Sequence, residues 1–139
     1  MWKYFALLSA VFAALTAILA KIGLKGVNSN LATAIRTVVI VILAWGIVAF
    51  SGELRGIKTL TRQNLLFLCL SGLATGLSWI FYFRALSTGP VSKVAPIDKL
   101  SVALAVTMAF LFLGEKPTTG NVLGAGLIVA GVLVTVFVK

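Results

Sequence analysis

The sequence predicts an all-α protein that crosses a membrane with five helices. Of its 139 residues, 60% are hydrophobic and 11% are charged, and the mean hydropathy is +1.13. In soluble proteins about half of the residues are apolar and about a quarter are charged. The apolar residues also fall into five runs, each close to the roughly 20 residues that a helix needs to cross a bilayer. Lipid is therefore expected to be the solvent for most of these side chains.

Five is an odd number of spans, so the two termini should lie on opposite faces of the membrane. We expect residues 1–139 to form a single transmembrane domain with no separate soluble part. A bundle of five helices is too small to enclose much of a pathway by itself. The chain therefore reads as one half of a larger architecture.

The first span is predicted at about residues 2–22, between Lys3 and Lys21. A signal peptide also begins with a basic residue and an apolar run, but this run is long and has no clear small-residue cleavage site near Ala20, which favours a retained helix. The next loop offers Asn28 as a cap. The second span follows at about residues 31–50.

The third span is predicted at about residues 65–83, after the polar linker 51–64. Its last turns carry the aromatic side chains of Trp79, Phe81, Tyr82 and Phe83. Such a group is typical of an interfacial belt. The alternative is that these rings line a pocket.

The fourth span is predicted at about residues 92–113 and the fifth at about 121–138. The start of the fourth is open, because Pro90 and Pro96 could each occupy a first helical turn. If the helix starts near Pro90, Asp98 and Lys99 lie two turns inside it. If it starts near Pro96, both lie at the level of the lipid headgroups.

Basic residues are divided evenly between the two faces of the membrane. If alternate loops share a face, one face carries Lys3, Arg55, Lys58, Arg62 and Lys116, and the other carries Lys21, Lys25, Arg84, Lys93 and Lys139. The positive-inside rule then gives no preferred orientation. Two copies inserted in opposite orientations would form an inverted pair, as the repeats of many secondary transporters do. The alternative is a fixed topology set by folding or by a partner.

Ionisable residues inside the spans are costly and usually face a bundle interior, a cavity or one another. We therefore expect a buried pairing of Asp98 with Arg36, Lys21 or Lys99. Arg36 and Asp98 are candidates for function as much as for structure, whereas Lys21 can also extend its charge to the interface. A proton coupled through a carboxylate would use Asp98 or Glu115, although Glu115 is more simply an interfacial residue.

Small residues recur at four-residue spacing, which allows helix backbones to approach closely in lipid. The glycines of this kind, candidates for packing or dimer contacts, are Gly72, Gly76, Gly120, Gly124 and Gly131. Packing inside one bundle explains them as well as contact between copies. With one cysteine and no histidine, the sequence offers no metal site, and it shows neither a catalytic nucleophile–base pair nor a phosphate loop, so we expect no enzyme and no cofactor.

The stretch from Trp79 to Val134 resembles the carboxyl-terminal part of an EamA domain of the drug/metabolite transporter superfamily. The resemblance rests on an aromatic-rich helix end, "RAL", a Gly-Pro turn, "AP" in the next helix, "LGE" at its end and a glycine-rich last helix. Earlier residues match by hydropathy, charge placement and length. The positions that match the family's pattern are Tyr82, Arg84, Pro90, Ala95, Pro96 and Glu115.

The resemblance implies a multi-pass transporter of small organic metabolites that works by alternating access, in the plasma membrane of a prokaryote. Typical members carry two such domains in opposite orientation, and this chain carries one half of that ten-helix inverted-repeat architecture. We therefore expect a homodimer, antiparallel if both orientations insert, or a pair of related half-subunits. Its cavity would be lined by the first, third and fourth helices. The substrate-binding candidates are Arg36, Trp79, Tyr82, Asp98 and Lys99, and the candidates for coupling or ion pairing are Lys21, Asp98 and Glu115.

Several alternatives stay open from the sequence. The basic lining favours an anionic or zwitterionic solute, although Asp98 would also suit a cation. The basic residues are better explained by the lipid surface than by nucleic acid. The rival function is a non-transporting membrane subunit that packs against a larger or oppositely oriented partner through its glycines.

Overall fold

A computed structural model describes residues 1–138 and consists of helices joined by short loops. Lys139, one of the flanking charges considered above, lies outside the described residues. In chain order the elements are α1 (Trp2–Gly23), α2 (Ser29–Phe50), the 3₁₀ helix η1 (Glu53–Thr59), α3 (Arg62–Thr88), α4 (Val91–Asp98), α5 (Leu100–Phe112) and α6 (Thr119–Phe137). The described chain contains no strand. Five stretches are long and apolar enough to cross a membrane, with α4 and α5 together forming the fourth, so the predicted all-α membrane fold is confirmed.

Local sequence explains where the helices begin. The side chain of Asn28 accepts hydrogen bonds from the backbone N–H groups of Asn30 and Leu31, at 2.9 and 3.4 Å, and so caps α2. The Thr118 hydroxyl caps α6 in the same way through the Asn121 N–H, at 3.2 Å. Each cap satisfies amide donors that have no partner inside the helix.

The "LGE" sequence forms the cap that ends α5. Gly114 has a φ of +68°, a left-handed conformation that glycine adopts without strain. This turn lets the Glu115 N–H reach back to the Ala109 carbonyl at 3.3 Å, so that a carbonyl of the last helical turn gains a donor from beyond the helix end. Gly114 and the backbone of Glu115 therefore close a helix end.

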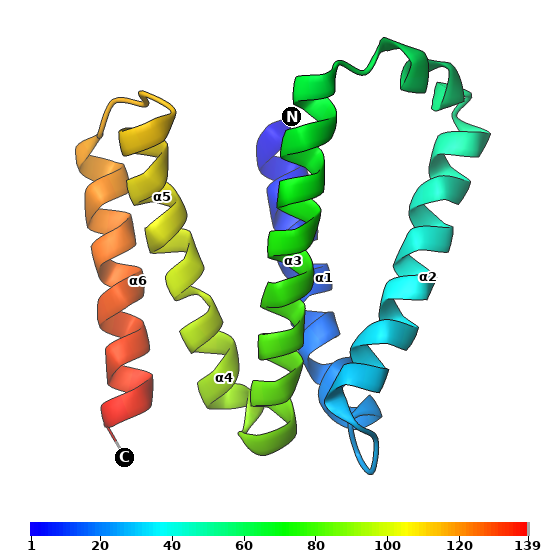
Figure 1. The fold of residues 1–139 in the computed structure, drawn as a ribbon. Helices are drawn as coiled ribbons and strands as arrows, with labels where there is room; N and C mark the ends of the chain where they lie inside the picture. The colour runs from blue at the N-terminus through cyan, green and yellow to red at the C-terminus, as the bar shows by residue number, and fades with distance from the viewer. Residues whose placement is uncertain (139) are drawn as a thin grey trace. The chain divides into compact units, whose positions relative to one another are not determined.

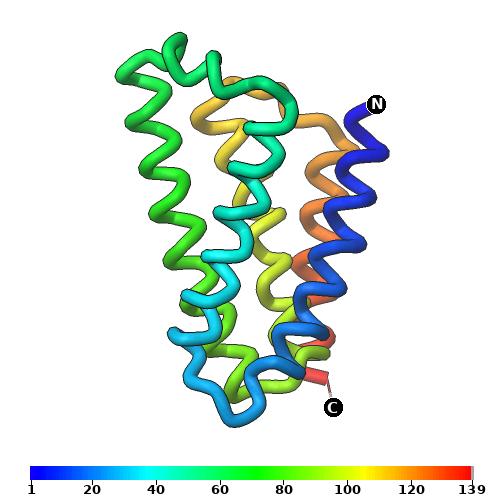
Figure 2. Tube along the Cα trace, turned by 90° about the vertical axis from the view of Figure 1, so that its right-hand side faces the viewer, coloured from blue at the N-terminus to red at the C-terminus, as the bar shows by residue number. Residues whose placement is uncertain are grey.

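The described chain divides into two compact units, and each is considered by itself. The first contains Met1–Ile18 together with the chain from Thr88 onward. In this unit α6 returns antiparallel beside α4 and α5 and contacts both of them (Figure 1; Figure 2). The Val132 side chain of α6 is buried.

The fourth span is one helix interrupted at Lys99. The N–H groups of Lys99 and Val102 bond to carbonyls three residues back, Pro96 and Lys99, at 2.9 and 3.0 Å. The Asp98 carbonyl accepts a bond from the Ser101 hydroxyl at 2.6 Å instead. Pro96, one turn earlier, lacks an N–H, and a serine hydroxyl that bonds to the preceding turn bends helices. The interruption thus follows from two residues of the sequence.

The second unit, residues 19–87, is held together where the end of α1, the start of α2 and the end of α3 meet. Leu24, Thr33, Phe83 and Leu86 are buried there. The Lys21 ammonium donates a hydrogen bond to the Leu86 backbone carbonyl. This contact joins the last turn of α1 to α3 and gives an in-span lysine a polar partner. At their other ends α2 and α3 are connected through η1 (Figure 1).

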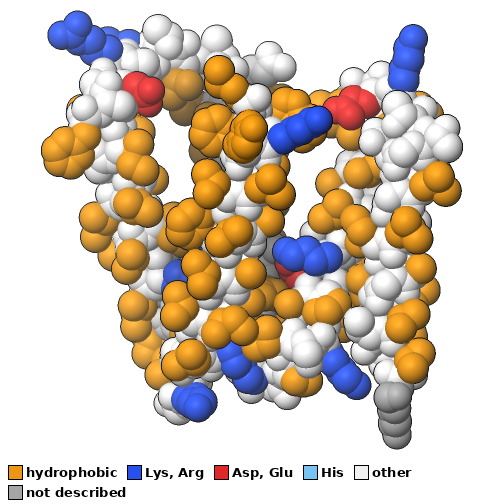
Figure 3. Space-filling view, turned by 180° about the vertical axis from the view of Figure 1, so that it is seen from behind, with side chains coloured by type: hydrophobic (Ala, Val, Ile, Leu, Met, Phe, Trp, Pro, Cys, Tyr) orange, Lys and Arg blue, Asp and Glu red, His pale blue; other side chains and the backbone are white. Residues whose placement is uncertain are grey.

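Apolar side chains cover the helices along their lengths, whereas most basic side chains stand near helix ends (Figure 3). Of the described residues only six are buried: Ala17, Leu24, Thr33, Phe83, Leu86 and Val132. Such exposure of leucine, isoleucine and phenylalanine would be unfavourable in water. It is the surface expected of a chain whose solvent is lipid.

We predict that Ser101→Ala lowers the free energy of unfolding in detergent by about 1 kcal/mol, because the Asp98 carbonyl loses its donor. Thr107→Ala is the matched control. The Thr107 hydroxyl bonds to the Ala103 carbonyl at 2.9 Å, but there the regular helix supplies a backbone donor as well. Thermal or denaturant unfolding of both variants measures the difference. Equal effects would show that the Ser101 bond does not compensate the interruption.

Candidate functional site

Arg36 is the charged side chain that lies inside α2. It follows Ser29, the first residue of the helix, by seven positions, which places it about 10 Å along the helix at 1.5 Å per residue. Its side chain is half-buried. The guanidinium is thus set at a depth where water is scarce, and its immediate surroundings decide its energy.

Two aromatic rings of α3 lie against this guanidinium. Its central carbon is 4.3 Å from the centre of the Trp79 ring and 5.0 Å from that of the Phe83 ring. Trp79 and Phe83 are four positions apart, so both project from the same face of α3. We call Trp79 and Phe83 the aromatic clamp. Trp79 therefore contacts α2, and the interfacial and pocket interpretations of these aromatic residues both stay predictions.

The clamp is itself held in place by packing. Phe83 is 3% exposed, and its ring meets that of Tyr82 edge-on, with the centres 6.4 Å apart and the planes at 64°. A cation over an aromatic face gains about 0.5–1 kcal/mol at exposed sites and about 2 kcal/mol or more when desolvated. Within residues 19–87 the sole carboxylate belongs to Glu53, at the opposite end of α2. In this unit it is therefore the rings that stabilise the charge of Arg36.

Phe83 was not among the site residues predicted from the sequence. Four aromatic residues crowd the end of α3, and the pattern alone does not say which of them face α2. The usable signal is the four-residue spacing of Trp79 and Phe83, which becomes informative once a cation is known to face that side of the helix.

In the other unit, Asp98 and Lys99 form an ion pair, with 3.2 Å between the Lys99 ammonium and an Asp98 carboxylate oxygen. Lys99 is one of the three partners expected for Asp98. The pair is not buried in the described chain, since the side chains are 34% and 53% exposed for Asp98 and Lys99.

The same region settles where the fourth span begins. Pro90 is the N-cap of α4, and Pro96 lies inside the helix. Asp98 and Lys99 are therefore two turns inside the span, at the interruption between α4 and α5. This placement corresponds to the first of the two starts considered from the sequence.

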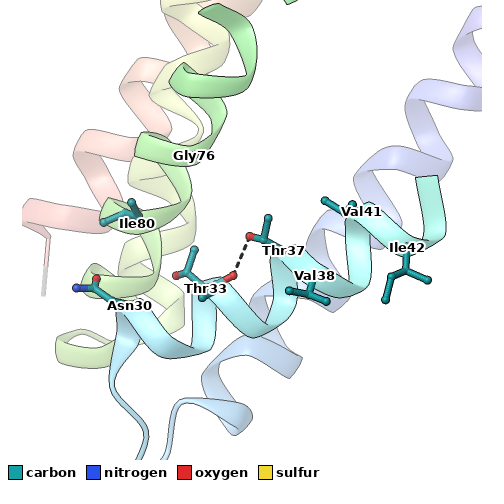
Figure 4. A pocket seen from close by; sticks show the side chains of 9 residues that line it. Asn30, Thr33, Thr37, Val38, Val41, Ile42, Gly76 and Ile80 are labelled. Atoms are coloured by element: carbon teal, nitrogen blue, oxygen red, sulfur yellow. Dashed lines mark hydrogen bonds between the residues drawn. The ribbon is translucent and has the colours of Figure 1, made fainter. Parts of the chain in front are cut away.

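A pocket of about 510 Å³ lies between α2 and α3 (Figure 4). Its walls are mainly apolar and are formed by Asn30, Thr33, Ala34, Thr37, Val38, Val41, Ile42, Gly76 and Ile80. The hydroxyls of Thr33 and Thr37 donate to carbonyls of their own helix, Ser29 and Thr33, at 2.9 and 2.8 Å, and so do not make the pocket polar. None of the five predicted substrate-binding residues belongs to this lining, so the predicted cavity between the first, third and fourth helices stays a prediction.

The predicted glycine faces are open. A Cβ atom built on Gly72, Gly76, Gly120, Gly124 or Gly131 meets no atom within 4 Å. The described residues also include no group of three or more carboxylate, cysteine or histidine side chains that could hold a metal ion. The chemistry visible in the two units is therefore that of charge and aromatic contact.

Comparison with known proteins identifies the group to which this chain is related. Residues 1–137 match the EamA-like transporter family. The chain belongs to this family. A relative from a Sinorhizobium species, described as an uncharacterized transporter in the cobO 3′ region, is 51% identical over 132 residues, which are 95% of this chain and 94% of the relative. No solved structure matches.

Membership of the EamA family, together with the five apolar helices, supports a multi-pass membrane transporter with a lipid bilayer around it and a small molecule as its substrate. The same coverage shows that this EamA chain and its Sinorhizobium relative match over almost their whole lengths.

We predict that Arg36 and Trp79 are energetically coupled in the folded EamA chain. In a double-mutant cycle of Arg36→Met and Trp79→Leu, the coupling free energy should be about 0.5–2 kcal/mol in favour of the native pair. Denaturant unfolding in detergent measures each corner of the cycle. Trp45, an exposed residue further along α2, is the matched control, and its cycle with Arg36 should show a coupling near zero.

Proposed function

We propose that this chain is a secondary transporter that moves small organic metabolites across the plasma membrane of a prokaryote, as an antiparallel homodimer that works by alternating access. The observation that carries the proposal is the family match over residues 1–137 in a chain with five candidate spans. Five spans place the ends of a chain on opposite faces. A second copy in the opposite orientation would complete a ten-helix pair with inverted topology.

In this proposal residues 1–139 act as one transmembrane domain. Trp79 and Tyr82 provide aromatic walls, and Arg36, Asp98 and Lys99 provide polar contacts. Asp98, Lys21 and Glu115 are the candidates for coupling or for ion pairs. The placement of Asp98 and Lys99 at an interrupted helix supports their role, because unwound turns within membrane helices commonly line substrate and ion sites.

A second candidate function is a non-transporting subunit that binds a larger or oppositely oriented partner. The open glycine faces favour it as much as they favour a homodimer. Topology and self-association separate the two.

We predict dual topology. In a Cys69→Ala background, single cysteines at Asn28 and at Lys58 should both be labelled, in comparable fractions, by an impermeant thiol reagent applied to intact cells. Asn28 lies in the loop before α2 and Lys58 in η1 after it, so the two positions are on opposite faces in any one orientation. Labelling of only one position would mean a fixed topology and would contradict the antiparallel homodimer.

We also predict that Gly131→Leu lowers the dimer fraction in lipid at least about tenfold, because a large side chain would separate the helix backbones. Gly126→Leu is the matched control on the same helix. Gly126 lies on another face of α6 and is equally open, so its substitution should leave the dimer fraction unchanged. Fluorescence energy transfer between labelled copies in liposomes measures both. Unchanged transfer for Gly131→Leu would exclude this face as the contact.

A further inference from the structure

The spans carry more positive charge than the chain can neutralise. Within the five candidate spans the acidic residue is Asp98, whereas the basic residues are Lys3, Lys21, Arg36, Arg62, Arg84, Lys93 and Lys99. Asp98 is already paired with Lys99. A second copy of the chain would bring the same excess, so homodimer formation cannot supply the missing negative charge. An anion from outside the protein can.

Arg36 is the cation best arranged to receive that anion. Trp79 and Phe83 lie against its guanidinium, with the central carbon 4.3 and 5.0 Å from the ring centres. A guanidinium that stacks on aromatic rings places its faces against them and keeps its edges available for hydrogen bonds. In the part of the chain that the structure describes, its N–H groups donate no hydrogen bond to a protein acceptor. In the described chain no buried side-chain nitrogen lacks a partner, so the nitrogens of Arg36 must reach open space.

The edge of a guanidinium presents parallel N–H donors whose spacing matches the two oxygens of a carboxylate, and the resulting pair is charge-assisted and bidentate. An aromatic clamp that fixes the plane of the guanidinium fixes the direction of these donors. The arginine side chain then loses its conformational entropy before the ligand binds, and binding itself no longer carries that cost. The arrangement therefore favours a planar anion over a spherical one.

We propose that Arg36, held by Trp79 and Phe83, binds the carboxylate group of a small organic acid, and that this contact determines which solutes the protein accepts. This inference rests on the proposed transport function for its biological meaning. It deepens that function by naming carboxylates as the substrate class. Trp79 and Phe83 act as positioning residues, because they orient Arg36 rather than touch the oxyanion.

The experiment uses the full chain with Trp2→Phe and Trp45→Phe in nanodiscs of phosphatidylcholine, so that Trp79 is the remaining tryptophan. Propanoate and its uncharged counterpart propanamide are titrated while Trp79 fluorescence and thermal stability are recorded at constant ionic strength. We expect a saturable fluorescence change and a rise in Tm with propanoate, and at least about tenfold weaker binding of propanamide. Arg36→Lys keeps the charge but loses the bidentate edge, so it should weaken the binding of propanoate at least about tenfold.

Equal responses to the two probes in the unsubstituted site would overturn the proposal even if Arg36→Lys fails to fold. An unchanged propanoate affinity in a folded Arg36→Lys protein would overturn it as well. A second arm adds phosphatidylglycerol to the nanodiscs. If this lipid alone changes Trp79 fluorescence and abolishes the response to propanoate, the oxyanion site belongs to lipid headgroups and the solute assignment fails.

Binding in nanodiscs requires neither flux nor two orientations, so the inference and the proposed function fail separately. Arg36-dependent propanoate binding together with fixed topology and no uptake into liposomes would contradict the transporter while retaining the carboxylate site. Uptake of solutes with no preference for propanoate over propanamide would contradict the carboxylate site while retaining the transporter.

Discussion

A charge at bilayer depth has to find its partner in the protein or in a ligand, because hydrocarbon offers none. This constraint explains the polar contacts of the structure. Lys21 donates to the Leu86 carbonyl, Arg36 lies against two rings, and Asp98 pairs with the residue next to it. The contacts of Lys21 and Arg36 each join two helices, and the contact of Asp98 lies at an irregular turn. The charged side chains therefore fix points of contact between helices whose surfaces are otherwise apolar.

The interruption at Lys99 connects local chemistry to function. Pro96 and Ser101 together loosen one turn of the fourth span, and the acidic residue found within the spans lies in that turn. A regular helix would hide its carbonyls inside its own hydrogen bonds. Here the Asp98 carbonyl is held by a hydroxyl that can rotate away, so this turn can change its pairing without unfolding the rest of the span. In the proposed transporter that property would suit a site that alternates between two states.

Hydropathy predicted the five spans because lipid imposes one requirement on every crossing helix. It could not predict how far α3 continues, since Arg62 and Thr88 extend the helix through polar residues that lie beyond the apolar run. Hydropathy placed the fourth span but not its start, because either Pro90 or Pro96 can occupy the first turn of a helix. The contact of Arg36 with Phe83 and the pocket beside Gly76 depend on how α2 and α3 lie together, which no periodicity encodes. The role of "LGE" in ending a helix is also visible only in the structure, where its glycine lets the backbone N–H of Glu115 bond to the last turn of α5.

The surface presents exposed apolar side chains, open glycines and in-span cations. Lipid acyl chains stabilise only the first of these. Exposed leucine, isoleucine and phenylalanine side chains are satisfied by acyl chains, whatever else is present. Open glycines gain little from lipid, because their advantage lies in letting another backbone approach closely. The excess of in-span cations gains nothing from acyl chains or from a copy with the same excess. The glycines therefore favour a protein partner and the cations favour an anion, which are the two components that a transporter built from half-size subunits requires.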